Sequence, residues 1–120
     1  MIFKKVACYC LIFTGILTVM LGTAHNFAPL FMKSIRFNEA GDLWLFEVTG
    51  TAILFAGLLV IFAAMGLRKD KGMAFAVGVG SGIFLLVIGI SANIMIPTNW
   101  GAWLLTTFGL ISTSLSIYLK

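Results

Sequence analysis

Four long runs of apolar residues follow one another along the chain, and polar residues gather in the gaps between them. Each run has the length of about 17 to 25 residues that a helix needs to cross the hydrocarbon of a bilayer. The four runs are Val6 to Ala28, Leu43 to Leu67, Met73 to Ile96, and Trp100 to Leu119. The pattern therefore predicts four membrane-spanning helices.

The connections between these runs are short. The longest, Pro29 to Asp42, predicts one sizeable loop, whereas Arg68 to Gly72 and Pro97 to Asn99 predict tight turns. Short connections force neighbouring helices to be antiparallel. We therefore predict an all-α fold: a single transmembrane domain over residues 1–120, built as an up-down-up-down four-helix bundle.

Composition agrees with a membrane protein. Of the 120 residues, 61% are hydrophobic and only 10% are charged, and the mean hydropathy is +1.11. An ordinary soluble domain carries about 25% charged residues. This composition excludes a disordered chain, a nucleic-acid-binding domain and a secreted disulfide scaffold. Membrane lipids are the first partners we expect, and nucleic acid is not among them.

Basic residues are distributed unevenly between the two ends of the predicted bundle. Lys33 and Arg36 lie at one end, beside two acidic residues, Glu39 and Asp42. The other six lie at the end that holds both termini: Lys4, Lys5, Arg68, Lys69, Lys71 and Lys120. Because Lys and Arg concentrate on the cytoplasmic side of a membrane, we predict a multi-pass protein with both termini in the cytoplasm.

Three polar residues stand inside the apolar runs, where they usually face other helices because exposure to hydrocarbon is costly. They are His25, Glu47 and Asn93, and each lies 20 to 22 residues from a basic anchor of its own helix. At about 1.5 Å per residue, all three lie about 30 to 33 Å from the inner surface. We therefore predict one polar level near the outer boundary of the hydrocarbon, where the three side chains point inward and meet.

Small residues support this inward orientation. Each of the three polar residues continues a stripe of small residues on its helix, and small residues let helix backbones approach closely in membranes. We expect the following glycines at helix contacts: Gly22, Gly50, Gly57, Gly78, Gly82 and Gly89.

The polar level offers limited chemistry. A pair of His25 and Glu47 can relay a proton or exchange hydrogen bonds with a ligand carbonyl. The structural alternative is that His25 and Asn26 cap the first helix at the membrane boundary, while Glu47 holds helices together. One His, one Glu and one Asn are too few for a zinc, iron or haem site, so we predict no metal and no catalytic residue.

Tryptophans lie close to the same level. We place Asn26, Trp44 and Trp103 at the rim of the predicted pocket. The alternative for the tryptophans, which include Trp100, is an aromatic belt at the membrane boundary.

The two halves of the chain share a faint repeat. AHNFAP, which begins at Ala24, matches ANIMIP, which begins at Ala92, so that His25 aligns with Asn93. In the same way WLFEVTG matches WLLTTFG, and Glu47 aligns with Thr106. This predicts two parallel helical hairpins related by an axis along the membrane normal, and adds Thr106 to the candidate polar residues. The alternative is a chance match in a chain of biased composition.

Two stretches carry a resemblance to a known family. FEVTGTAILFAGLLVIFAAMGLRKDK, from Phe46 to Lys71, and LGTAHNFAP, from Leu21 to Pro29, resemble the DoxX and DoxX-like membrane proteins. These are four-helix proteins of similar length, associated with membrane oxidoreductase assemblies and quinone-linked sulfur oxidation, and distant relatives act as assembly factors or cargo receptors. By position, Glu47, Gly50 and Gly57 correspond to residues of the family's pattern. The resemblance implies a bacterial inner membrane.

The chain departs from that family at two points. His25 stands where a Lys or Arg is common, and Cys8 and Cys10 are spaced too closely for a CxxC redox pair. Both cysteines are expected to pack as apolar side chains. The missing redox pair puts electron transfer by this chain itself in doubt.

Without an extramembrane domain, the chain must act on hydrophobic molecules or on membrane partners. We expect a small non-catalytic subunit or a protein that binds a lipid or a quinone in the polar pocket, with other membrane subunits or a second copy as partners. No other cofactor is expected. One alternative is an oligomeric transporter, either for a small solute or coupled to protons. The other is an isomerase-type membrane enzyme, whose chemistry normally needs more than one carboxylate in the pocket.

Overall fold

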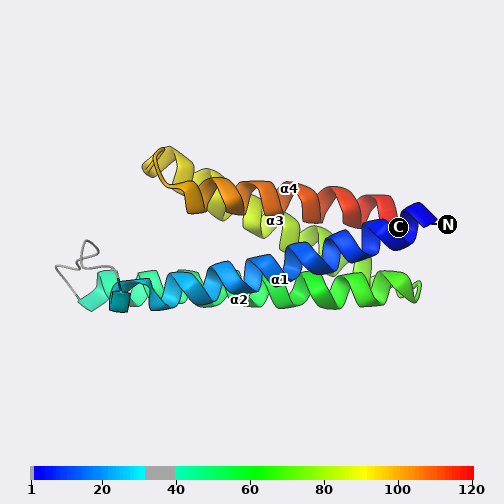
Figure 1. Ribbon diagram of the computed structural model, residues 1–120, viewed down its shortest axis with the longest axis horizontal. Helices are drawn as coiled ribbons and strands as arrows, with labels where there is room; N and C mark the ends of the chain where they lie inside the picture. The colour runs from blue at the N-terminus through cyan, green and yellow to red at the C-terminus, as the bar shows by residue number, and fades with distance from the viewer. Residues whose placement is uncertain (1, 32–39) are drawn as a thin grey trace.

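Four α-helices make up the part of the chain that the computed structural model describes, residues 2–31 and 40–120. They are α1 (Ile2–Phe31), α2 (Ala40–Arg68), α3 (Gly72–Met95) and α4 (Trp100–Leu119) (Figure 1). Each helix is long and apolar enough to cross a membrane, and the described ranges contain no strand. The all-α prediction of four such helices is confirmed, and it indicates a multi-pass membrane protein.

The first two helices extend beyond their apolar runs at both ends. The first helix begins at Ile2 and continues through Pro29 to Phe31, and the second begins at Ala40. Backbone hydrogen bonding does not stop where side chains become polar, so a helix can outrun its membrane-spanning stretch. Both ends of the predicted loop from Pro29 to Asp42 are therefore helical. Its middle, residues 32–39 with Lys33, Arg36 and Glu39, lies outside the described residues.

The helices pack as two antiparallel hairpins, α1 with α2 and α3 with α4 (Figure 1). The hairpins meet through contacts of α2 with α3 and of α1 with α4, so α1 and α3 are diagonal to each other. Figure 1 shows both termini and the α2–α3 turn at one end, where the hairpins lie close, and the hairpins diverging toward the other end. We name the first the basic end, after the six basic residues of that end, and the second the Asn99 end, after the α3–α4 turn.

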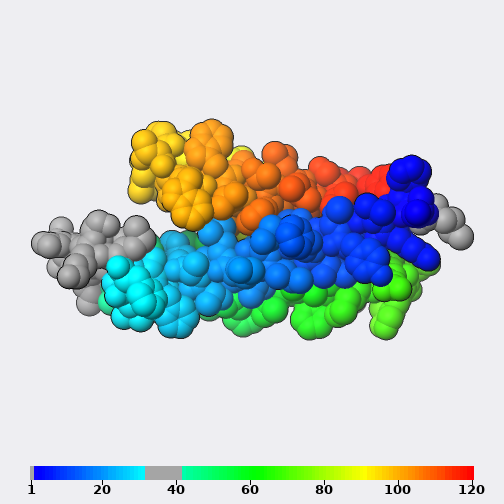
Figure 2. Space-filling view, viewed as in Figure 1, coloured from blue at the N-terminus to red at the C-terminus, as the bar shows by residue number. Residues whose placement is uncertain are grey.

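The two hairpins differ in length. Helices α1 and α2 have 30 and 29 residues, whereas α3 and α4 have 24 and 20. At about 1.5 Å per residue, α1 is about 45 Å long and α4 about 30 Å. The space-filling view in Figure 2 shows the resulting elongated molecule, with the first hairpin running along its length.

Large apolar side chains cover the outside of this bundle as well as contributing to its core. Large aromatic residues such as Phe13, Phe55 and Phe62 are about 60% exposed, at 61%, 60% and 61%. The buried core combines aliphatic side chains with small polar ones: Leu11, Ile53, Val60, Leu85, Thr18, Ser112 and Ser116 are all nearly inaccessible. Such an exterior suits acyl chains, and such a core lets helices approach closely.

Glycines lie where the helices of each hairpin touch. A Cβ at Gly22 would come within 2.6 Å of the Leu54 backbone nitrogen, and one at Gly57 within 2.7 Å of the Val19 backbone nitrogen. The other glycines expected at contacts are equally crowded by side chains: Gly50 by Asn26, Gly78 by Ser116, Gly82 by Thr113 and Gly89 by Thr106. Close backbone approach is therefore built into both hairpins.

Candidate functional site

His25 binds the neighbouring helix at the Asn99 end. Its half-buried imidazole stacks on the ring of Phe46, with centroids 3.8 Å apart and planes 18° apart. The His25 Nε2 atom lies 3.1 Å from the Phe46 carbonyl oxygen. Because a carbonyl can only accept, Nε2 is the donor, and in the neutral ring Nδ1 is then an acceptor.

Asn26 makes the second bridge between α1 and α2. Its Nδ2 donates to the Thr51 hydroxyl at 3.1 Å, and that hydroxyl donates to the Glu47 carbonyl at 2.9 Å. Gly50 makes this arrangement possible, since a Cβ there would collide with Asn26 and come within 2.9 Å of the His25 ring. The Asn26 Oδ1 atom is buried and has no hydrogen-bond partner among the described residues.

Glu47 is half-buried on α2, one turn before Gly50 and Thr51. It follows directly after Phe46, the residue on whose ring His25 stacks. Among residues 2–31 and 40–120, however, no hydrogen bond or salt bridge is found for its carboxylate. The structure thus brings His25 and Glu47 near each other without a direct bond between them.

Asn93 and Thr106 form a separate pair in the second hairpin. The Asn93 Nδ2 atom donates to the Thr106 hydroxyl at 3.0 Å, and this hydroxyl donates to the Ala102 carbonyl at 3.0 Å. The Asn93 Oδ1 atom is buried and finds no hydrogen-bond partner in the part of the chain that the structure describes. Within the described ranges, no hydrogen bond joins Asn93 to His25 or Glu47. The polar level is therefore divided between the two hairpins, which diverge toward this end of the molecule (Figure 1).

A small cavity of about 90 Å³ connects the two hairpins near the Asn99 end. The first hairpin contributes Leu21, His25, Thr49 and Ile53 to its lining, and the second contributes Ile88, Ala92, Asn99, Gly101, Ala102 and Leu105. Of the residues singled out from sequence as pocket or rim, His25 alone lines it. The lining of this cavity thus combines polar and aliphatic residues from both hairpins.

Thr49 and Asn99 are polar residues of this cavity that sequence reasoning missed. The Thr49 hydroxyl donates to the Leu45 carbonyl at 2.8 Å, so it faces any ligand as an acceptor. Asn99 caps α4, with its Oδ1 accepting from the Gly101 backbone N–H at 3.0 Å, which leaves its amide group as a donor. An Asn directly before an apolar helix is a known N-cap signal, and it could have drawn attention to Asn99.

The predicted rim tryptophans lie elsewhere. Trp44 and Trp103 are exposed, and neither lines the cavity. The Trp103 indole N–H donates to the Pro97 carbonyl at 3.1 Å, which ties α4 to the preceding turn. The aromatic-belt alternative describes these exposed side chains better than a pocket rim does.

Metal binding has no support among the described residues, which contain no group of three or more His, Cys, Asp or Glu side chains placed to hold an ion. Comparison of the chain with protein-family models, with curated proteins and with solved structures gave no match. The resemblance to DoxX proteins and the internal repeat both stay predictions.

Proposed function

We propose that this chain is a non-catalytic membrane-embedded binding protein that holds the hydroxyl-bearing end of a hydrophobic ligand between its two hairpins. The ligand class is a lipid or a reduced quinone. The observation that carries the proposal is the cavity lined by His25 and Thr49 from one hairpin and Asn99 from the other.

Hydrogen-bonding capacity selects the ligand group. His25 and Thr49 have already used their donor hydrogens on carbonyls, so they offer acceptors, whereas the Asn99 amide offers a donor. A hydroxyl group donates and accepts at once and matches this set. A hydroxyl can donate its one hydrogen to His25 or Thr49 while it accepts from Asn99, whereas a quinone or ester carbonyl can only accept and finds one matching group.

The size of the cavity selects how much of the ligand enters. Small-molecule sites measure about 300 to 1,000 Å³, whereas this cavity measures about 90 Å³. A single polar end group fits, and the rest of the molecule has to remain outside among acyl chains. The exposed apolar surface of the helices is suited to such a ligand.

The charge distribution supports an orientation. If the basic end faces the cytoplasm, as the preference of Lys and Arg favours, the cavity lies toward the outer leaflet. The resemblance to DoxX proteins supports a bacterial inner membrane as the location. In this proposal, the ligand therefore enters sideways from the outer half of the bilayer.

A cavity-filling variant tests the proposal. Ala92 lines the cavity on α3, whereas Ala76 is an exposed residue of the same helix. The full chain, extracted together with its native lipid, is expected to retain a hydroxylated lipid or quinol detectable by mass spectrometry. Overpacking costs about 1 to 3 kcal/mol, so Ala92→Leu should lower the retained amount at least about fivefold. Ala76→Leu should leave it unchanged.

A direct titration distinguishes the ligand class. Decylubiquinol is expected to bind the purified chain more tightly than decylubiquinone, because only the quinol can donate a hydrogen to His25 or Thr49. Equal binding of both probes would contradict the hydrogen-bonding argument. Two results would overturn the proposal in favour of a purely structural subunit. One is equal retention of the ligand by the Ala92→Leu and Ala76→Leu variants, and the other is a stoichiometric larger complex without any retained ligand.

A further inference from the structure

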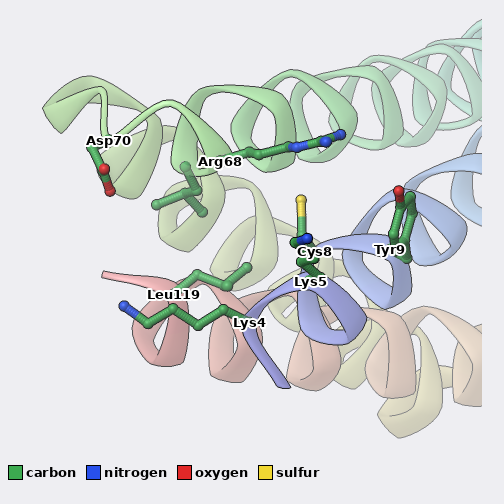
Figure 3. A pocket seen from close by; sticks show the side chains of 8 residues that line it. Lys4, Lys5, Cys8, Tyr9, Arg68, Asp70 and Leu119 are labelled. Atoms are coloured by element: carbon green, nitrogen blue, oxygen red, sulfur yellow. The ribbon is translucent and has the colours of Figure 1, made fainter. Parts of the chain in front are cut away.

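A second and larger cavity lies at the basic end, far from the cavity near the Asn99 end. It measures about 380 Å³ and opens between the start of α1, the end of α2 and the end of α4 (Figure 3). Its lining combines cationic, polar and apolar side chains: Lys4, Lys5, Cys8, Tyr9, Leu67, Arg68, Asp70 and Leu119. This volume is within the range of small-molecule sites.

The cations of this cavity outnumber its carboxylates. Among residues 2–31 and 40–120, Lys4, Lys5 and Arg68 form no salt bridge, and Asp70 is the one carboxylate in the lining. Figure 3 shows the Arg68 side chain extending along α2 away from Asp70, and Lys4 running beside Leu119. Three cations against one carboxylate leave an excess of two positive charges, which favours an anionic ligand.

Other polar groups of the cavity have different roles. The Cys8 thiol donates to the Ala64 carbonyl, with Sγ 3.3 Å from the oxygen, and in Figure 3 it points toward α2. Cys8 therefore joins α1 to α2 at the base of the cavity. Tyr9 is exposed, and its phenol can donate a further hydrogen bond to a ligand oxygen.

Apolar surface adjoins the cationic groups. Leu67 and Leu119 belong to the same cavity. A neighbouring cavity of about 600 Å³ also includes Arg68, and there the apolar side chains are Ile12, Phe62 and Met65. Lys69 and Lys71 complete its cationic side. Arg68 thus lines both cavities, and in each of them cationic side chains lie next to apolar ones.

We propose that the cavity at the basic end binds the phosphate headgroup of an anionic phospholipid, with its acyl chains along the adjoining apolar surface. Arg68 can hold two phosphate oxygens at once through its planar guanidinium, and the lysines add positive charge. Basic pockets between membrane helices bind anionic headgroups on the same principle. The adjoining apolar surface favours a lipid over free phosphate, which would leave it unused.

Native mass spectrometry of the full chain in neutral detergent tests this proposal. Phosphatidylglycerol should bind at least about tenfold more tightly than phosphatidylcholine with the same acyl chains. A cation near a lipid headgroup contributes about fivefold in affinity, so Lys5→Gln combined with Arg68→Gln should weaken phosphatidylglycerol binding about 25-fold. Lys4→Gln alone should weaken it about fivefold, and provides the test if the double variant does not fold.

Lys120→Gln is the matched control. Lys120 lies at the same end, but its ammonium group sits over the Phe75 ring, 4.3 Å from the centroid, and it does not line the cavity. Its replacement should change the affinity less than twofold. Equal weakening by Lys120→Gln and Lys4→Gln would overturn the site, since it would indicate diffuse charge attraction. Displacement of the lipid by equimolar inorganic phosphate would overturn the choice of a lipid.

Discussion

Many threonine side chains in the bundle find a hydrogen-bond partner within their own helix. Several threonine hydroxyls donate to the carbonyl one turn earlier in their own helix, among them Thr14, Thr18 and Thr23. The bond between Asn93 and Thr106 is different because it joins two helices. In hydrocarbon such a bond has no competing water, so the residue pair has a measurable role in holding α3 to α4.

A double-mutant cycle measures that role. Interhelical hydrogen bonds in membranes contribute about 0.6 kcal/mol on average and up to about 1.7 kcal/mol. Asn93→Ala and Thr106→Val should therefore show a coupling free energy in that range when unfolding is followed in micelles with increasing denaturing detergent. Thr107→Val is the control, because the Thr107 hydroxyl donates within its own helix. Coupling of Asn93 to Thr107 as large as that to Thr106 would contradict the pairing.

At the residue scale, the sequence indicates which polar groups interrupt the apolar runs, but not which partners they have. His25, Glu47 and Asn93 stand out because polar residues in an apolar run are costly to bury. Their partners depend on the rotation of each helix about its axis and on which helices are diagonal, and no local pattern specifies these. For this reason, Thr49 and Asn99 were missed at the cavity, although His25 was found.

At the element scale, the contact between α1 and α2 depends on glycine at the crossing. The missing side chain of Gly57 lets the backbone of α1 approach at Val19, and Gly22 does the same for α2 at Leu54. In contrast, Gly80 on α3 is exposed, with nothing within 4 Å of where a Cβ would be. A methyl group added at Gly57 would therefore collide with a neighbouring helix, whereas one added at Gly80 would meet open space.

Two alanine substitutions should show this difference. Gly57→Ala should lower the free energy of unfolding by about 1 to 3 kcal/mol, because the added methyl overpacks against backbone that must move. Gly80→Ala should leave it unchanged or raise it by up to about 1 kcal/mol, since alanine is the better helix former. Thermal unfolding in one detergent compares the two variants. A Gly80→Ala protein that is destabilised as much as Gly57→Ala would refute the assignment of Gly57 to a close contact.

The existence of the elements was predictable because four apolar runs of sufficient length permit few other structures. Their ends were less predictable: α1 passes through Pro29, and α2 begins at Ala40. Hydropathy reports where side chains meet hydrocarbon, whereas helix ends are decided by backbone hydrogen bonds and caps. The stripes of small residues indicated the contact faces, but the register of one helix against another required the three-dimensional structure.

At the scale of the whole molecule, both termini lie at the basic end (Figure 1). Reporter domains fused before Met1 and after Lys120 should therefore report the same side of the membrane. We expect that side to be the cytoplasm, because six of the eight basic residues belong to this end. Reporters that are active in only one compartment provide the measurement. Opposite sides for the two fusions would exclude a four-span topology.

The antiparallel order of the helices followed from the short connections alone. The divergence of the hairpins toward the Asn99 end did not, since it arises from how the two interfaces between hairpins are packed. Both cavities depend on that packing. This is why the sequence pointed to a single shared polar layer where the structure has a pair of polar residues in each hairpin.

The unequal lengths of the hairpins have a consequence for the surrounding lipid. A bilayer that matches α4 is about 15 Å thinner than α1 is long, at about 1.5 Å per residue. The first hairpin then has to tilt or extend beyond the hydrocarbon core of the bilayer, while the length of α4 matches the thickness of that core. Lipids beside the first hairpin therefore contact longer helices than lipids beside the second. The tilt of the protein should change with the thickness of the membrane.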